Sequence, residues 1–116
     1  MTRDINGIIA RWLGWTTLEP SKAQLELNKL GWHYGTKWVA PNGHLEFYPP
    51  CYDEDSVAIT LLPELVQRGF ETSLIYTTQG ANFDISENIG HVVSQGQAST
   101  INGAICAAVV QLIESI

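Results

Sequence analysis

Residues 71–116 read ETSLIYTTQGANFDISENIGHVVSQGQASTINGAICAAVVQLIESI, and most of the predicted fold follows from them. The segments ETSLIYTT, ANFDISE and IGHVVSQ are rich in β-prone residues and are separated by turn residues, which predicts two or three antiparallel strands. We expect a turn at Gln79-Gly80 and a last strand bounded by Gly90 and Gly96. An amphipathic helix follows, capped at Thr100 or the residue before it, with one apolar face formed by Ile101, Ala104, Ile105, Ala108, Val109, Leu112 and Ile113.

Three helices are expected upstream of this stretch. The first ends at Gly14, and its apolar residues recur at helical spacing at Ile5, Ile8, Ile9, Trp12 and Leu13. A short second helix is predicted by Ser21 and Gln24, which have the spacing of a capping box. The third covers residues 53–69, where Pro63 should kink or restart the helix because proline lacks a backbone donor.

Between the second and third helices, the segment TKWVAPNGHLEFY (36–48) predicts a β-hairpin. Asn42-Gly43 separates two aromatic and β-branched segments, and we expect both residues to adopt positive φ in the turn. Alternate residues of a strand face opposite sides, so Trp38 is expected to share a face with Leu45 and Phe47. Trp38 and Phe47 are therefore predicted to pack into the core.

Composition limits the class of protein. The chain of 116 residues has 45% hydrophobic and 16% charged residues, which predicts one folded α+β domain over residues 1–116 with a mainly antiparallel sheet. The formal net charge of −6 and the scattered basic residues argue against a nucleic-acid polymer as partner. The N-terminus has neither a signal peptide nor a membrane-spanning pattern, and only two cysteines are present. We therefore expect a cytoplasmic protein, without a membrane partner and without a cofactor.

Five short motifs occur in a fixed order: Gly14-Trp15, Trp38-x-x-Pro41-x-Gly43, Pro49-Pro50-x-Tyr52-x-x-Asp55, Arg68-Gly69-Phe70, and Ala98-x-Thr100 leading into Ala104-Ile105-Cys106-x-Ala108. Together they resemble the small phage proteins grouped as the phage ABA sandwich domain family. The resemblance spans nearly the whole chain. It implies a three-layer helix–sheet–helix sandwich, a phage or prophage origin and a location in the host cytoplasm, but no established reaction.

Two departures from the family's pattern limit what the resemblance carries over. The segment 16–31 is longer than the connection expected in the family. Ala107 stands where a basic residue is expected, so no role for a basic side chain at that position is transferred.

The histidines, acids and cysteines have simpler explanations than catalysis. His33, His44 and His91 lack the paired spacing of a metal site. Three consecutive acids, Asp53-Glu54-Asp55, are typical of a helix start, although the same residues could bind a divalent cation. Cys51 is expected to be exposed and Cys106 to be buried, and neither has a recognisable catalytic base. We predict no catalytic residue and no metal site.

Aromatic residues are concentrated in one region of the chain. Residues 31–52 read GWHYGTKWVAPNGHLEFYPPCY and hold six of the eleven Phe, Trp and Tyr residues. Part of this stretch is expected to be core, and part to be a contact surface, because Pro- and Gly-rich loops expose what they carry. The residues with an open assignment between core and surface are Trp32, Tyr34, Tyr48 and Tyr52.

Two functions from different classes fit these features. The first is a non-enzymatic binding module that sequesters a small nucleotide immune signal, by analogy with other small phage proteins. Its predicted ligand-binding residues are Lys37, Trp38, Tyr48, Tyr52, Arg68, Asn82, Phe83 and Asn88. The alternative is a protein–protein interaction module or inhibitor that binds a host or phage protein through its aromatic loops, which the acidic charge also suits. Homo-oligomer formation is expected in both cases, because it would bury exposed aromatic residues.

Overall fold

The computed structural model spans residues 1–116 and describes 4–52, 57–88 and 90–115. The chain divides into two compact units, each described by itself: unit 1 comprises Met1–Ile9 and Pro50–Ile116, and unit 2 comprises Ala10–Pro49. Helix α1 (Ile5–Trp12) gives its first residues to unit 1 and its last to unit 2. Asp4 caps this helix, since its side-chain Oδ1 accepts a hydrogen bond of 3.0 Å from the Gly7 N–H.

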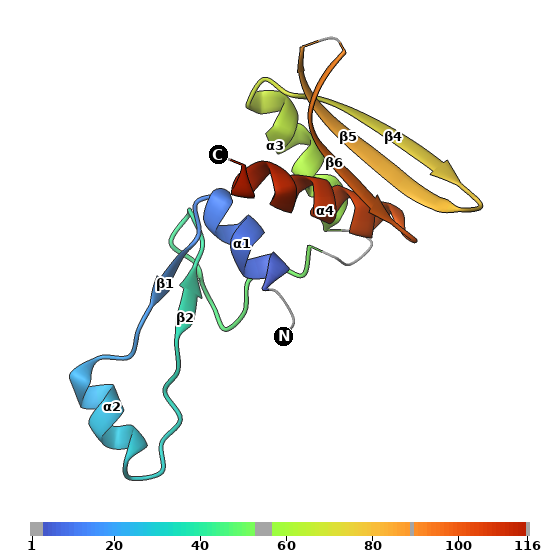
Figure 1. Cartoon of the computed structure of the whole chain (residues 1–116). Helices are drawn as coiled ribbons and strands as arrows, with labels where there is room; N and C mark the ends of the chain where they lie inside the picture. The colour runs from blue at the N-terminus through green and yellow to red at the C-terminus, as the bar shows by residue number, and fades with distance from the viewer. Residues whose placement is uncertain (1–3, 53–56, 89, 116) are drawn as a thin grey trace. The chain divides into compact units, whose positions relative to one another are not determined.

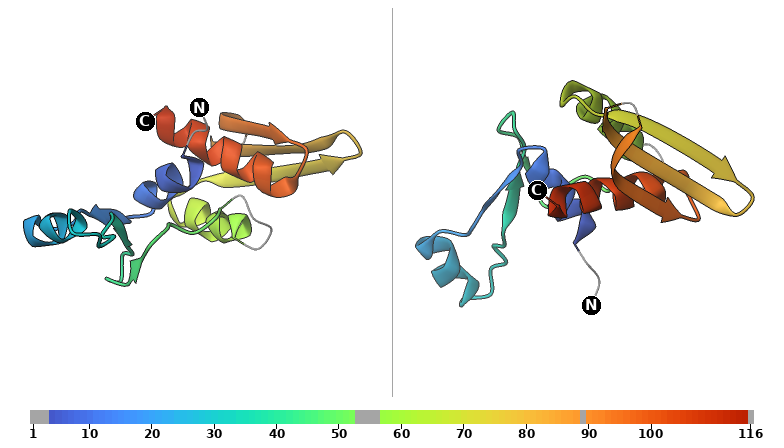
Figure 2. Two further views of the ribbon diagram at one scale, coloured as in Figure 1. Left: turned by 90° about the horizontal axis from the view of Figure 1, so that it is seen from below. Right: turned by 45° about the horizontal axis from the view of Figure 1, so that its top comes forward.

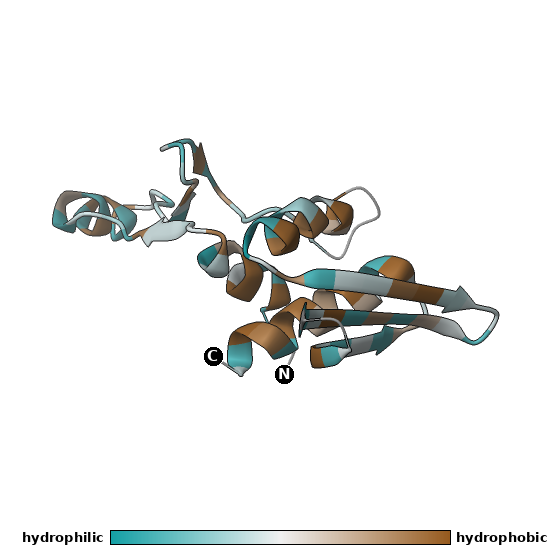
Figure 3. Ribbon diagram, turned by 90° about the horizontal axis from the view of Figure 1, so that it is seen from above, coloured by the Kyte–Doolittle hydropathy of each residue, from teal (hydrophilic) through white to brown (hydrophobic). Residues whose placement is uncertain are grey.

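Unit 1 is built on an antiparallel sheet of three strands, β4 (Glu71–Thr77), β5 (Gly80–Asn88) and β6 (His91–Ala98), in the order β4-β5-β6 (Figure 1). Helix α4 (Ile101–Glu114) covers one face of this sheet, and Figure 3 shows its apolar residues and those in the middle of β4 in brown. Thr100 caps α4 by accepting a hydrogen bond of 3.0 Å from the Gly103 N–H. The core between sheet and helix consists of Ala81, Phe83, Ile85, Ala104, Ile105, Ala108, Val109 and Leu112.

Gly96 lies inside β6 and allows α4 to approach the strand closely. A Cβ at this position would clash with the backbone oxygen of Ala104 and would lie 2.5 Å from the backbone nitrogen of Ala108. Beside it, the Ser94 hydroxyl donates a hydrogen bond of 2.5 Å to the Ala108 carbonyl. The prediction that Gly96 bounds the strand is therefore wrong: the glycine is required by packing, not by strand termination.

The helical segment before the sheet has two parts. A 3-10 turn, η1 (Ala58–Thr60), leads directly into α3 (Leu61–Gln67), and Pro63 lies in the first turn of α3. A proline is tolerated there because its missing N–H would have no partner within the helix. The helix ends at Gly69, whose φ of 91° allows Phe70 N–H to bond to the Leu65 carbonyl at 3.0 Å. Of the predicted kink or restart, the structure has a change from 3-10 to α-helix at Leu61, two residues before Pro63. Residues 53–56, with the predicted acidic helix start, lie outside the described residues.

Unit 2 contains a second small antiparallel sheet, β1-β2-β3, and one helix. The strands are β1 (Thr16–Leu18), β2 (Lys37–Val39) and β3 (Leu45–Glu46). Helix α2 (Lys22–Asn28) has the predicted capping box: Gln24 N–H donates to Ser21 Oγ at 3.2 Å, and Ser21 N–H donates to Gln24 Oε1 at 3.0 Å. Strand β1 was not predicted, because three residues before a proline give too short a pattern.

The β2–β3 hairpin is confirmed, but its turn differs from the prediction. Gly43 N–H bonds to the Ala40 carbonyl at 2.8 Å, and of the turn residues only Gly43 has a positive φ, at 88°. Pro41 therefore lies within the turn, where its fixed φ suits the first central position. The loop is one residue longer than a two-residue turn, so Trp38 pairs with Glu46 and Val39 pairs with Leu45.

This register moves the apolar residues of β3 to the other face, because a one-residue shift exchanges the two faces of a strand. Trp38 shares its face with Glu46, and Leu45 lies on the opposite face. Phe47 is 73% exposed. The predicted core position of Trp38 is confirmed, and that of Phe47 is wrong.

The mixed α+β class with antiparallel sheets is confirmed. Figure 2 shows α4 lying along the three-stranded sheet of unit 1 in both further views. On the other face of that sheet Ile75, Asn82, Gln95 and Gln97 are exposed. A third, helical layer on that face stays a prediction.

Candidate interaction surface

Unit 2 exposes most of its large apolar side chains. Among its residues, all of which the structure describes, only Ala10 and Trp38 are buried. Helix α2 has no buried residue at all. The exposed apolar set of unit 2 consists of Leu18, Leu25, Leu30, Trp32, Leu45, Phe47 and Tyr48, each at least 48% exposed. Large apolar side chains exposed in such number are often found at interaction sites of folded proteins.

The side chain of Asn28 bonds across the loop after α2. The Asn28 amide donates a hydrogen bond of 2.9 Å to the Tyr34 carbonyl and accepts one of 2.7 Å from the Tyr34 N–H. This pair of bonds closes the loop, and within it the rings of Trp32 and Tyr34 stack with centroids 6.2 Å apart. The loop therefore presents an ordered aromatic pair, which costs less entropy to bind than a flexible one.

The end of β3 forms a second part of this surface. Lys37, Leu45, Glu46 and Phe47 line a small hollow of about 240 Å³. His44 Nε2 lies 2.8 Å from the Glu46 carboxylate, and both side chains are exposed. Lys37 is therefore beside an aromatic ring, as a nucleotide site would require, but it is also beside a carboxylate that opposes an anionic ligand.

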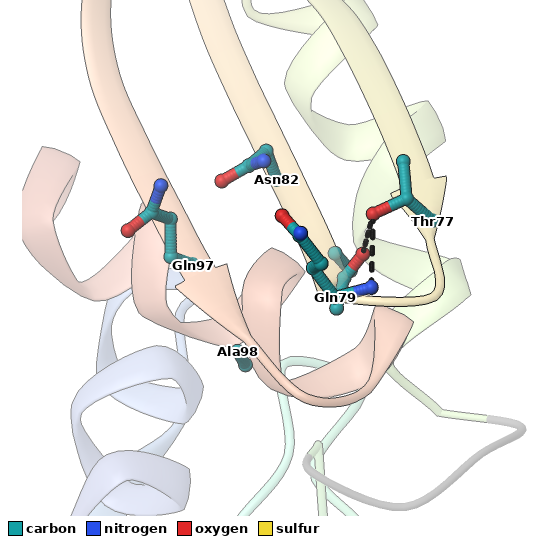
Figure 4. Close-up of a pocket in the computed structure, with 7 residues that line it drawn as sticks. Thr77, Gln79, Asn82, Gln97 and Ala98 are labelled. Atoms are coloured by element: carbon teal, nitrogen blue, oxygen red, sulfur yellow. Dashed lines mark hydrogen bonds between the residues drawn. The ribbon is translucent and has the colours of Figure 1, made fainter.

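The uncovered face of the unit 1 sheet is polar. Asn82 of β5 and Gln97 of β6 project from neighbouring strands into a hollow of about 350 Å³, where Thr77 Oγ1 accepts a hydrogen bond of 3.1 Å from the Gln79 N–H (Figure 4). A further hollow of about 540 Å³ shares Asn82 and Gln97 and adds the side chain of Asp84. Among the described residues no Lys or Arg lines either hollow. These hollows suit a neutral polar ligand better than a phosphate.

Tyr52 is a core residue, although it was predicted to bind ligand. It is 3% exposed, and its backbone N–H donates a hydrogen bond of 2.8 Å to the Asn6 side chain. Its carbonyl accepts a bond of 3.0 Å from the buried Cys106 thiol. Burial raises the pKa of Tyr52 to about 12, because the phenolate is poorly solvated there. Tyr52 thus ties the segment after Pro50 to α4.

The structure does not gather the eight predicted ligand-binding residues into one site. Lys37, Trp38 and Tyr48 belong to unit 2, and the other five belong to unit 1. Tyr48 is 80% exposed, whereas Phe83 lies in the core and cannot contact a ligand at the surface.

The remaining predicted residues of unit 1 also lie apart from one another. Asn82 is on the polar face of the sheet, opposite the face that holds Phe83. The Arg68 guanidinium donates a bond of 2.8 Å to Glu64, on α3. The side chain of Asn88 lies outside the described part of the chain. The exposed residues Leu45 and Phe47 were missed because the assumed hairpin register buried them.

Side chains with catalytic or metal-binding chemistry are dispersed over the described parts of the chain. Within 4–52, 57–88 and 90–115, no three His, Cys, Asp or Glu residues gather in a way that could hold a metal ion. Cys51 is exposed and Cys106 is buried, as predicted. In the same ranges, no helix has the length and apolar character needed to cross a membrane.

Comparison of the chain with protein-family models, with curated proteins and with solved structures found no match.

Proposed function

We propose that the protein is a non-enzymatic interaction module that binds a partner protein through the exposed apolar set of unit 2. The observation that supports this is the imbalance between exposed and buried side chains in that unit. Seven large apolar side chains are exposed, while the only large buried one is Trp38. A unit of this size normally needs a larger core to remain folded.

Charge points to the same kind of partner. Unit 2 carries four Lys or Arg and three Glu residues, so the exposed apolar set lies in a nearly neutral environment. Lys29 is paired with Glu26 at 3.0 Å on the exposed side of α2. Apolar and aromatic anchors surrounded by a few balanced charges are the usual composition of a protein interface. Under the resemblance to phage ABA sandwich proteins, the partner is a phage or host protein.

A nucleotide signal is the second candidate ligand, and Lys37 beside the exposed Phe47 ring is the observation that favours it. A dinucleotide needs several cations around its phosphates. Glu46 lines the same hollow as Lys37 and reduces its attraction for an anion. A thermal-shift screen with cyclic dinucleotides, cyclic trinucleotides and ADP-ribose-type signals separates the two candidates, because a ligand that binds the folded state raises Tm.

The interaction itself is tested by affinity purification from host lysate with three baits. The baits are the unmodified protein, the double variant Phe47→Ser/Tyr48→Ser, and the control Val66→Ser, which removes an exposed apolar side chain from unit 1. We expect one protein to be retained by the first and third baits and lost with the double variant. A partner retained equally by all three baits would show that unit 2 is not the binding surface.

A further inference from the structure

Strand β4 is an unpaired edge of the unit 1 sheet. The strand order β4-β5-β6 leaves one side of β4 without a neighbouring strand, and Figure 1 shows β4 as the outermost strand. Its sequence ETSLIYT contains no proline, no lysine and only one charged residue, Glu71. The pairing with β5 is regular from Glu71 to Thr77, without a bulge. Natural edge strands normally carry a proline, a lysine or other charge, or a β-bulge that prevents pairing with another chain.

The register identifies which backbone groups of β4 point away from the sheet. Thr77 pairs with Gly80 across a two-residue turn, which makes them a hydrogen-bonded pair. Because such pairs alternate along an antiparallel ladder, the N–H and C=O groups of Thr72, Leu74 and Tyr76 point to the free edge. The same alternation, carried across β5, directs the Gln95 N–H of β6 to the other edge. That N–H donates to Gln111 Oε1 at 3.0 Å, which confirms the assignment.

The outward backbone groups are therefore protected at the β6 edge of the sheet but not at the β4 edge. On β6, Gln111 of α4 accepts the outward Gln95 N–H, and the pairing with β5 is irregular between Ile85 and Ser86. Both features hinder a further strand from adding to β6. Over residues 71–77 of β4, all of which are described, no side chain bonds to an outward backbone group of Thr72, Leu74 or Tyr76. The unprotected edge strand carries three exposed large apolar side chains, Leu74, Ile75 and Tyr76, whereas β6 exposes Val92.

We propose that β4 pairs with β4 of a second copy of this chain, antiparallel and centred on Leu74, to form a continuous six-stranded sheet. In this two-fold register Leu74 lies opposite Leu74 of the second copy, and Thr72 lies opposite Tyr76. The residue numbers of each pair therefore sum to 148. All outward N–H and C=O groups of these residues then form inter-strand bonds. Glu71 lies opposite Thr77, so the one charge on the strand meets a neutral side chain.

Side chains on both faces of β4 gain from this pairing. On the α4 side, Leu74 and Tyr76 line a hollow of about 390 Å³ that also contains Ile59, Leu62 and Ile101. The second copy brings its own Leu74 and Tyr76 next to this apolar hollow. On the other face Ile75 is exposed and lies opposite Ser73 of the second copy. Cross-strand apolar pairs stabilise a sheet, and a second copy is the only partner for which the register itself guarantees complementarity.

The test uses charge at the centre of the proposed pairing. Leu74→Lys and Leu74→Glu each place like charges directly opposite one another on the two-fold axis, so each variant should be monomeric. An equal mixture should form dimers again, because Lys then lies opposite Glu. The control is Val92→Lys on β6, since Val92 and Leu74 are both 43% exposed. Sedimentation or light scattering should give twice 12.8 kDa for the unmodified protein and for the control.

Three results would overturn the proposal: an unmodified protein that is monomeric from micromolar to millimolar concentration, dimers that persist in both Leu74 variants, or a mixture that stays monomeric. If the variants do not fold, hydrogen exchange of the unmodified protein gives the answer. The amides of Thr72, Leu74 and Tyr76 should exchange more slowly at high protein concentration than at low concentration. Unchanged exchange at these amides would also refute the pairing. The variants leave unit 2 unaltered, so this test is independent of the proposed function.

Discussion

Gly96→Ala is the substitution for which the structure gives the clearest expectation. At most strand positions, replacing glycine by alanine stabilises a protein by about 0.4–1 kcal/mol, because it reduces the freedom of the unfolded chain. The backbone of Gly96 does not have a positive φ, so alanine is sterically allowed by the strand itself. The added Cβ would nevertheless clash with the Ala104 oxygen and lie 2.5 Å from the Ala108 nitrogen. Chain entropy therefore predicts that Gly96→Ala raises the free energy of unfolding, whereas packing predicts that it lowers it.

The packing effect should dominate. Both atoms that the Cβ would meet belong to the α4 backbone, which cannot rotate away as a flexible side chain can. The helix must shift relative to β6, and overpacking of this kind costs about 1–3 kcal/mol or more. The gain in chain entropy offsets part of an overpacking cost near the upper end of that range, so we expect a net loss of about 2 kcal/mol. For a unit of this size such a loss lowers Tm by roughly 8–16 °C.

The assay is thermal and urea unfolding followed by far-UV circular dichroism, with Gly35→Ala as control. A Cβ added at Gly35 would have no atom within 4 Å, and the residue has no positive φ, so its substitution should be neutral or slightly stabilising. A Gly96→Ala variant that melts at or above the temperature of the unmodified protein would refute the close approach of α4 and β6.

Two further substitutions test unit 1. Ile105→Asp should leave unit 1 unfolded and poorly soluble, because it places an unpaired charge in the core, whereas Ile101→Asp in the first turn of α4 should be tolerated; circular dichroism of both variants checks this. Tyr52 has its pKa raised from 10.0 to about 12, so between these values the folded protein holds a proton that the unfolded chain loses. The contribution of Tyr52 to the free energy of unfolding should be fully present below about pH 10 and should fall as pH rises toward 12. The urea midpoint of Tyr52→Phe should therefore fall less over this window than that of the unmodified protein.

Local features of the fold could be predicted from sequence because their signals are local. The Ser21–Gln24 capping box and the helix end at Gly69 each depend on residues within one or two turns. The apolar face of α4 follows from spacing alone. Gly96 could not be assigned correctly, since its role depends on how closely Ala104 and Ala108 approach from another element.

The hairpin of unit 2 shows how one residue changes a predicted surface. Asn42-Gly43 correctly predicts a turn, but Pro41 joins it and lengthens the loop by one residue. That single residue moves Phe47 from the predicted core to the surface. The composition of the stretch is the same in both registers, so composition could not distinguish a core from a contact surface.

The predicted ligand-binding set also contained an inconsistency that strand geometry exposes. Asn82 and Phe83 are consecutive residues of β5, and consecutive residues of a strand face opposite sides. Both could not line one pocket, and the structure places Asn82 on the polar face and Phe83 in the core. Tyr52 was harder to assign, because its backbone is bonded to Asn6 and Cys106, which are far away in sequence.

The exposed apolar set of unit 2 supports a binding function because these side chains are not buried within unit 2 itself. The one large buried side chain, Trp38, lies under the Arg11 guanidinium at 5.0 Å, and such a contact contributes about 0.5–1 kcal/mol at an exposed site. Ordering the backbone costs about 1–2 kcal/mol for every residue. Caps and hairpin hydrogen bonds offset part of that cost, but hydrophobic burial normally supplies the largest favourable contribution. Under the proposed function a partner protein adds to that contribution by covering the Trp32–Tyr34 pair and Phe47.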